Sequence, residues 1–127
     1  MDKIKISETD IQSAIIRYLT ILENQGKLFF NRMNNIGVPI KDRQGKIVGQ
    51  RKTFGSKRGI PDIWVILQGK TIGLEVKTAT GRQSKEQKEI EERFKKNGAE
   101  YYIVRSLEDV KEVINGKIWN RVKIKWK

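Results

Sequence analysis

The stretch 59–77 constrains the fold of this chain more than any other part of it. Residues 63–67 and 71–76 are rich in β-branched and aromatic side chains, a composition typical of strands. Gln68 and Gly69 lie between them, and a two-residue turn that contains glycine is characteristic of a tight hairpin. The sequence therefore predicts two consecutive antiparallel strands.

The register of this hairpin follows from its turn. With Gln68 and Gly69 in the turn, Leu67 pairs with Lys70, and counting back along both strands places Asp62 opposite Glu75. Alternation along the strands then collects only apolar side chains on one face of the hairpin: Ile63, Val65, Leu67, Ile72, Leu74 and Val76. We expect this face to be buried.

The opposite face carries Asp62, Glu75 and, one step further along, Lys77. Directly opposed carboxylates lie about 5 Å apart, and their repulsion is destabilising unless a cation compensates it. Two acidic groups on rigid strands suit Mg²⁺, which prefers oxygen ligands. Alternatively, Asp62 only begins a strand after Pro61, and Glu75 and Lys77 form an exposed ion pair. The three residues on a common face, backed by an apolar face, favour the metal site.

The charge balance indicates the kind of partner. The chain holds 27 Lys and Arg against 15 Asp and Glu, a net charge of +12, which favours a polyanion such as nucleic acid. Four cations, Arg51, Lys52, Lys57 and Arg58, precede Asp62 in a segment with two glycines. Such a loop can approach phosphates closely, although it can also be a mobile, solvated loop.

The absence of two residue types excludes several chemistries. The chain has no Cys, which excludes disulfides and thiolate metal sites, and no His, which excludes histidine bases and Ser-His triads. Hydrolysis would have to use carboxylates, lysine, metal and water. There is no apolar run of about 20 residues and no apolar signal-peptide core. We expect one cytoplasmic domain over residues 1–127, without membrane association.

A helix is predicted near the N-terminus. Ser7 is a suitable N-cap, apolar residues recur at helical spacing from Ile11 to Leu22, and Gly26 is the stop signal. Glu8 lies at the N-terminal edge of the face that this spacing buries. It can complement the helix dipole, or it can be a third carboxylate directed at the metal.

A second helix is predicted from Ser84, which forms a capping box with Gln87, to about Asn97. Gln87 either completes this cap or reaches the acidic pair. The helix connects strand 71–77 to a buried strand at 101–105, and such a crossover makes the two strands parallel.

The remaining segments complete an α/β fold. A short strand is predicted at 28–30, a hairpin insertion at 40–48, a short helix after Ser106 and a strand at 117–127 with a basic outer edge. That basic edge either prevents edge-to-edge pairing or contacts nucleic acid or a dimer partner. The prediction is a mixed sheet flanked by helices, with a β-hairpin insertion and a C-terminal strand.

Asp62 after Pro61, followed by Glu75-Val76-Lys77, resembles the Pro-Asp…(Asp/Glu)-x-Lys motif of the restriction-endonuclease-like nucleases. Further motifs are Glu8 with Ile11-Gln12, Asn31-Arg32-Met33-Asn34, Gly59-Ile60-Pro61-Asp62-Ile63, Glu75-Val76-Lys77-Thr78, Gly81-Arg82-Gln83-Ser84 with Gln87, and Val104-Arg105. Together they resemble the VRR-NUC family, in particular its short stand-alone members in phages and bacteria. Ser106 stands where the family often has a second Arg, so the namesake triplet is incomplete.

The resemblance implies an α-β-β-β-α-β core and metal-dependent cleavage of phosphodiesters to 3′-hydroxyl and 5′-phosphate ends. By position, Asp62, Glu75 and the backbone carbonyl of Val76 would be the ligands of Mg²⁺, for which Mn²⁺ would substitute. Lys77 would orient or activate the water. The resemblance also makes Glu8 the helix carboxylate that assists the metal, and Gln87 the helix residue that faces the site.

The resemblance further implies a homodimer that cuts branched DNA, such as Holliday junctions, in DNA repair. The basic residues expected to bind nucleic acid are Arg32, Arg51, Lys52, Lys57, Arg58, Arg82 and Arg105. Two alternatives remain: a non-catalytic DNA-binding protein on the same fold, and a sequence-specific restriction-type endonuclease. An RNA substrate stays open as well.

Overall fold

The computed structural model describes residues 5–33, 38–51 and 57–125. The elements in these ranges are α1 (Glu8–Asn24), β1 (Phe29–Arg32), β2 (Val38–Lys41), β3 (Ile47–Arg51), β4 (Ile63–Leu67), β5 (Lys70–Val76), α2 (Lys85–Lys96), β6 (Glu100–Val104) and α3 (Leu107–Lys125). Without the β2–β3 hairpin and α3, this is the predicted α-β-β-β-α-β order.

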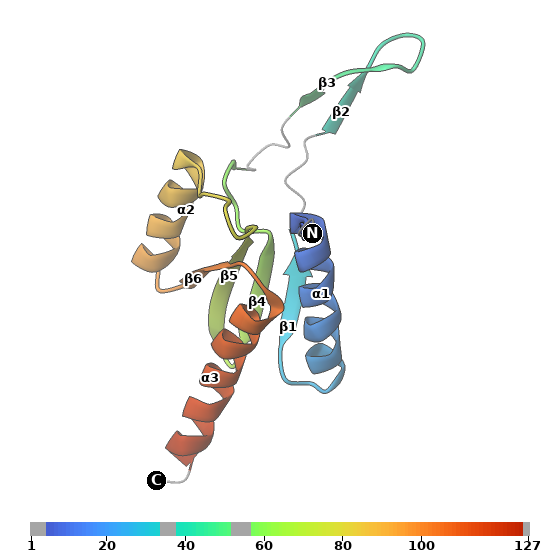
Figure 1. Ribbon diagram of the computed structural model, residues 1–127. Coiled ribbons are helices and arrows are strands. Elements are labelled where there is room, and N and C mark those ends of the chain that lie inside the picture. The colour runs from blue at the N-terminus through green and yellow to red at the C-terminus, as the bar shows by residue number, and fades with distance from the viewer. Residues whose placement is uncertain (1–4, 34–37, 52–56, 126–127) are drawn as a thin grey trace.

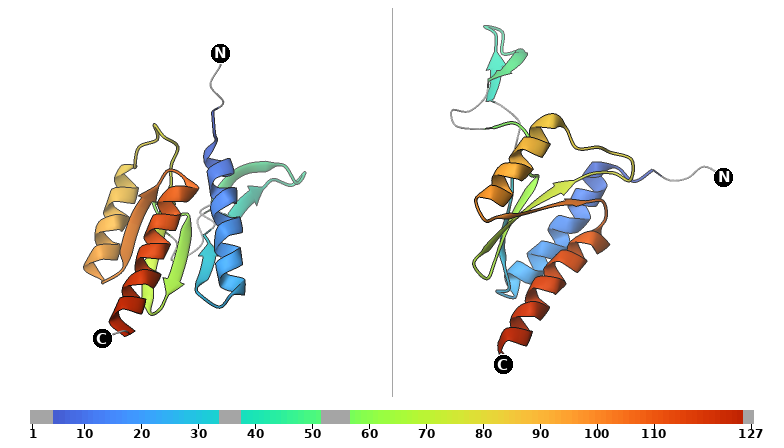
Figure 2. Two further views of the ribbon diagram at one scale, coloured as in Figure 1. Left: turned by 60° about the horizontal axis from the view of Figure 1, so that its bottom comes forward. Right: turned by 90° about the vertical axis from the view of Figure 1, so that its left-hand side faces the viewer.

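Four strands form the central sheet, in the order β1-β4-β5-β6. β4 pairs antiparallel with both β1 and β5, whereas β5 and β6 are parallel and connected by α2. The two long helices α1 and α3 lie on one side of this sheet and α2 on the other (Figures 1 and 2). The predicted mixed sheet between helices is confirmed.

The β4–β5 hairpin has the predicted register. Leu67 pairs with Lys70, and Ile63 pairs with Leu74 at the other end. Gln68 and Gly69 have φ angles of 53° and 83°, the left-handed conformations of a type I′ turn. The six apolar side chains predicted for one face, Ile63, Val65, Leu67, Ile72, Leu74 and Val76, are all fully buried.

The hydrophobic core lies between that apolar face and two helices. Ile15 and Leu19 of α1 and Val110 and Ile114 of α3 are fully buried in one cluster with the strand residues. The apolar spacing of α1 supplies this stripe, and the Ser7 hydroxyl accepts the Asp10 N–H at 3.1 Å as its cap. The core therefore holds β4 and β5 rigidly.

The predicted C-terminal strand is wrong, because α3 continues as a helix to Lys125. Its start is as predicted, since the Ser106 hydroxyl accepts the Asp109 N–H at 3.2 Å. Val110, Ile114 and Ile118 recur every four residues and pack in or against the core. A spacing of four is common to helical and alternating patterns, so Ile118 and the residues after it fit both. The packing of the preceding turns against the core favours continuation of the helix.

The β2–β3 hairpin forms a two-stranded sheet of its own and projects from the body (Figure 1). The predicted hairpin insertion is thus confirmed. None of the helices in the described ranges has the length and apolar character needed to cross a membrane.

Candidate functional site

The two predicted acids meet where β4 begins and β5 ends. Asp62 directly precedes Ile63, whose partner Leu74 directly precedes Glu75. The Asp62 carboxylate accepts the backbone N–H of Val76 at 2.8 Å, which ties the start of one strand to the end of the other. Asp62 is half-buried and Glu75 is 1% exposed.

Among the buried side chains that the structure describes, Glu75 is the one that carries a carboxyl group. Burial raises the pKa of Glu75 to about 8, helped by the hydrogen bond and the negative charge of Asp62, while Tyr101 and Lys77 act in the opposite direction. The Tyr101 hydroxyl donates to Oε2 of Glu75 at 2.8 Å. At neutral pH and without a cation, the Glu75 carboxyl group therefore retains its proton.

The proton that Glu75 retains beside a second carboxyl group fits a cation site. Two carboxylates that cannot both ionise alone are neutralised when a divalent cation replaces the proton. The donors are oxygens, which suits Mg²⁺ or Mn²⁺. The Lys77 N–H donates to the Val104 carbonyl of β6. Because successive residues of a strand direct their backbone groups to opposite edges, the N–H and the C=O of Val76 both point to the other edge, toward Asp62. Asp62, Glu75 and the Val76 carbonyl are thus close neighbours.

Glu8 lies in the first turn of α1, which begins at the end of the sheet where Asp62 and Glu75 lie (Figure 1). Its side chain is exposed. Within the described ranges, no three acidic side chains gather closely enough to hold one metal ion. Glu8 is at the expected end of the sheet but is not grouped with both other acids, and its role stays a prediction.

Gln87 forms the predicted capping box. Its amide oxygen accepts the Ser84 N–H at 2.8 Å, and the Ser84 hydroxyl accepts the Gln87 N–H at 3.1 Å. The cap therefore occupies the amide oxygen, and a role of Gln87 toward the metal stays a prediction. Gly59 packs on this helix start: its φ is 84°, and an added Cβ would lie 2.6 Å from the Glu86 backbone. The loop before Asp62 is thereby held against α2.

Lys77 follows β5 directly, and the loop after it is held by Arg105. The Arg105 guanidinium donates from Nη1 to the carbonyls of Thr78 and Gly81, at 2.6 and 2.7 Å. The sequence interpretation made Arg105 a nucleic-acid contact, which stays a prediction. The observed contacts give it a structural role in ordering the loop beside Lys77.

Tyr101 and Gln83 are site residues that the sequence interpretation missed. Gln83 donates to the Tyr101 oxygen at 3.3 Å and to Glu91 at 3.0 Å, so a chain of hydrogen bonds runs from Glu75 to α2. The only signal in the sequence was a tyrosine in a strand expected to be buried, because a buried hydroxyl needs a polar partner. The parallel register, which pairs Tyr101 with Gly73, selected that partner.

The basic residues expected to bind nucleic acid surround this end of the sheet. Arg32 ends β1, Lys57 and Arg58 precede Asp62, and Arg82 follows Lys77; all four side chains are exposed. The predictions for Lys52 and for the side chain of Arg51 lie outside the described residues.

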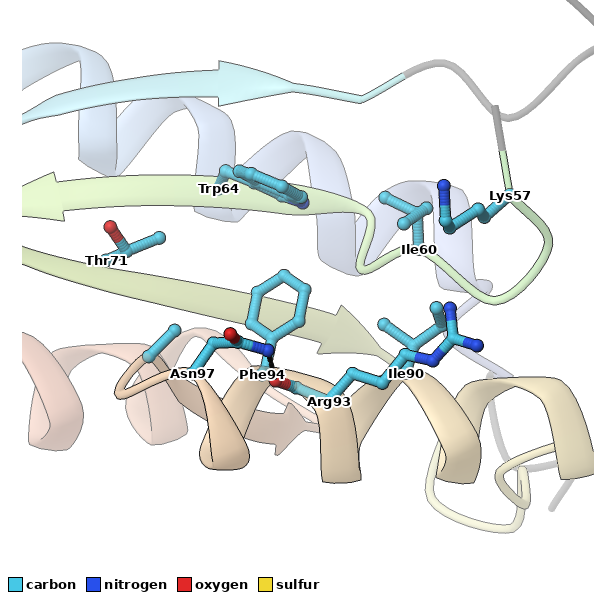
Figure 3. A pocket seen from close by; sticks show the side chains of 9 residues that line it. Lys57, Ile60, Trp64, Thr71, Ile90, Arg93, Phe94 and Asn97 are labelled. Carbon is cyan, nitrogen blue, oxygen red and sulfur yellow. Dashed lines mark hydrogen bonds between the residues drawn. The ribbon is translucent and has the colours of Figure 1, made fainter. Parts of the chain in front are cut away.

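A cavity of about 340 Å³ lies between α2 and the strands β4 and β5 (Figure 3). Trp64 and Phe94 line it and meet edge-on with ring centroids 5.1 Å apart. Its other lining residues are Lys57, Ile60, Thr71, Ile90, Arg93, Asn97 and Ala99. Within the described part of the chain, the buried Trp64 indole N–H has no hydrogen-bond partner. Neither acid lines this apolar cavity, which is separate from the acidic pair.

Comparison with known proteins supports the fold. A solved structure described as a "VRR_NUC domain" is similar to this chain with a TM-score of 0.56 and 23% sequence identity, over 85% of this chain and 94% of that one. No protein-family model matches the sequence, and no curated protein matches it. At this identity the likeness concerns the fold. The chain therefore has the restriction-endonuclease-like fold of a VRR_NUC domain, as its sequence motifs predict.

Proposed function

We propose that this protein is a metal-dependent DNA endonuclease that hydrolyses phosphodiester bonds. The observation that carries the proposal is the facing pair of Asp62 and Glu75, with Lys77 two residues after Glu75, on the fold of a VRR_NUC domain. A net charge of +12 provides the attraction that a polyanionic substrate needs.

Asp62, Glu75 and the Val76 carbonyl would hold Mg²⁺, with Mn²⁺ as a substitute. A bound ion of this kind polarises the scissile phosphate and lowers the pKa of water. Tyr101 holds one oxygen of Glu75 and so orients the carboxyl group, which leaves the other oxygen for the cation. The Val76 N–H fixes Asp62 in the same way.

Lys77 is the residue that acts on the phosphate. Its ammonium group would place positive charge where negative charge develops and would orient the attacking water. The water oxygen forms a bond to phosphorus in line with the departing O3′, and the P–O3′ bond breaks. A proton ends on O3′, so the products carry a 3′-hydroxyl and a 5′-phosphate.

The substrate that we propose is branched DNA, cut by a homodimer. The resemblance of the motifs to those of stand-alone junction-resolving nucleases supports this proposal. A homodimer has two active sites related by a two-fold axis, and these can cut two strands of one junction. The exposed cations Arg32, Lys57, Arg58 and Arg82 around the acidic end of the sheet would bind the flanking phosphates.

The test measures Mg²⁺-dependent cleavage of labelled linear, flap and four-way DNA. Asp62→Asn and Lys77→Ala should each reduce the cleavage rate about 100-fold or more, which is the scale on which groups that stabilise charge in the transition state act. Glu112→Gln and Lys96→Ala, exposed residues of α3 and α2, are charge-matched controls and should cut like the wild type. Wild-type rates for both Asp62→Asn and Lys77→Ala would refute the assignment. Equal rates on linear and four-way DNA would refute the branch preference.

A further inference from the structure

The β2–β3 hairpin, residues 38–51, is called the arm here. Among the described residues, its two strands pair only with each other and are not part of the central sheet. The views from different sides show it extending away from the body (Figures 1 and 2). A lone two-stranded hairpin is marginally stable in water, so an arm of this kind gains stability when it binds a partner.

The arm exposes apolar side chains that no core in the described chain covers. Ile40, Ile47 and Val48 are 37%, 59% and 62% exposed. Its tip is nevertheless ordered, because the Asp42 carboxylate accepts the backbone N–H groups of Gln44 and Lys46, both at 2.9 Å. The arm therefore presents a shaped, partly apolar surface.

The charge of the arm indicates what kind of partner it fits. Lys41, Arg43 and Lys46 are exposed, while Asp42, the arm's one acidic residue in the sequence, uses its carboxylate in the turn. A second copy of this chain also carries +12 and would repel the arm. A polyanion would attract it.

The arm leaves the body beside the acidic pair. Arg32, the last residue of β1, pairs with Ile63, and the Met33 N–H bonds to the Asp62 carbonyl at 2.8 Å. The chain returns from the arm to the loop that begins at Lys57 and leads directly to Asp62. If a DNA duplex is bound at Asp62, the groove next to the bound phosphate would therefore lie beside the arm.

We propose that the arm binds the groove of duplex DNA next to the cleavage site, an inference that rests on the proposed function. A two-stranded ribbon fits the major groove. Strands of this length span about 15 Å, roughly half of the ≈34 Å of one helical turn. Lys41, Arg43 and Lys46 contact phosphates, while Ile47 and Val48 contact sugars and base edges.

The first experiment separates the arm from general attraction by charge. The triple variant Lys41→Ala, Arg43→Ala and Lys46→Ala is compared with a control triple variant, Lys27→Ala, Lys70→Ala and Lys96→Ala. These three exposed cations lie outside the arm, after α1, at the start of β5 and at the end of α2. Binding to a fluorescent duplex of about three helical turns is measured by anisotropy in chelator, across a series of salt concentrations. The salt slope is the slope of the logarithm of the binding constant against the logarithm of the salt concentration, and each lost phosphate contact reduces its magnitude by about 0.9. The arm variant should therefore have a slope about 2 to 3 smaller in magnitude and an affinity about tenfold or more lower. The control should keep the wild-type slope.

The apolar part of the arm is tested separately. Ile47→Ser with Val48→Ser should weaken binding about fivefold or more and leave the salt slope unchanged, because apolar contacts release no counterions. Circular dichroism of each variant verifies that the body is folded, which we expect because none of the substituted arm residues belongs to the core cluster.

Two outcomes would overturn the inference. Arm variants whose affinity and salt slope equal those of the control show that the arm does not contact DNA. Arm variants that become monomeric in sedimentation, with unchanged affinity per protomer, show that it binds a second copy. If the wild type cuts DNA while either outcome holds, the arm inference fails alone. If the wild type neither binds nor cuts DNA, the proposed function fails and the inference with it.

Discussion

At the scale of single residues, the site depends on one buried carboxyl group. Glu75 is 1% exposed, faces Asp62 and accepts a hydrogen bond from Tyr101. A carboxylate buried beside another carboxylate lowers stability, so its presence needs a compensating function. The proposed metal-binding role would account for both acids at once.

The raised pKa of Glu75 predicts a pH-dependent stability. Between its ordinary value of 4.5 and about 8, the native state retains a proton that the unfolded state has lost. The free energy of unfolding should therefore fall as pH rises through this range, by up to about 1.4 kcal/mol per pH unit. Glu75→Gln cannot titrate and lacks this contribution. Urea unfolding of both proteins in chelator tests the prediction, and parallel pH profiles would contradict it.

Tyr101→Phe should weaken metal binding. The loss of the hydroxyl frees Glu75 from its orientation, and removal of such a supporting hydrogen bond typically costs 10- to 100-fold in metal affinity. Calorimetric titration with Mn²⁺ measures the effect without any substrate. Tyr102→Phe is the matched control, because the Tyr102 hydroxyl bonds to Glu100 instead. Equal affinities for the two variants would rule out the positioning role.

At the scale of elements, Gly73 allows α2 to pack closely on the β4–β5 hairpin. Gly73 lies opposite Trp64, and an added Cβ would lie 2.7 Å from Pro61 and 2.8 Å from Phe94. Its place in the middle of a strand, where glycine is normally unfavourable, is explained by this close packing. The position of α2, and with it the Ser84 cap, depends on this contact.

Gly73→Ala should therefore destabilise the protein by about 1–3 kcal/mol, the usual cost of overpacking. Gly116→Ala is the contrasting variant, since a Cβ there meets nothing within 4 Å and the residue lies inside α3. It should be neutral or stabilising by up to about 1 kcal/mol, because alanine favours helices. Thermal unfolding compares the two, and similar melting temperatures for both would contradict the packing argument.

At the scale of the whole molecule, a compact body and a projecting arm have separate roles. The body contains the core and both acids, whereas none of the arm side chains that the structure describes belongs to the core cluster. The excess of positive charge extends over both parts and favours contact with an extended polyanion. If the arm binds DNA as proposed, stability and substrate contact are separated in the fold.

Replacing residues 38–51 by a short Gly-Ser linker should leave the melting temperature within a few degrees of the wild type. The physical reason is that the arm side chains that the structure describes lie outside the core cluster, so the apolar burial of the body is retained. Differential scanning calorimetry measures this, with the linker protein compared at equal concentration. A loss of cooperative unfolding would show that the arm contributes to the core.

The β4–β5 register, and hence the facing acids, follow from the sequence alone, because a two-residue turn and a period of two leave no freedom. It also determined the helix starts at Ser7 and Ser84, where the cap is a local contact. The length of α3, in contrast, depends on packing in the folded molecule, because its spacing of four fits helix and strand alike. The contacts of Tyr101 with Glu75 and of Arg105 with the loop after Lys77 were likewise decided by the fold. They join residues far apart in the sequence, and no local pattern sets the register of parallel strands joined through a helix.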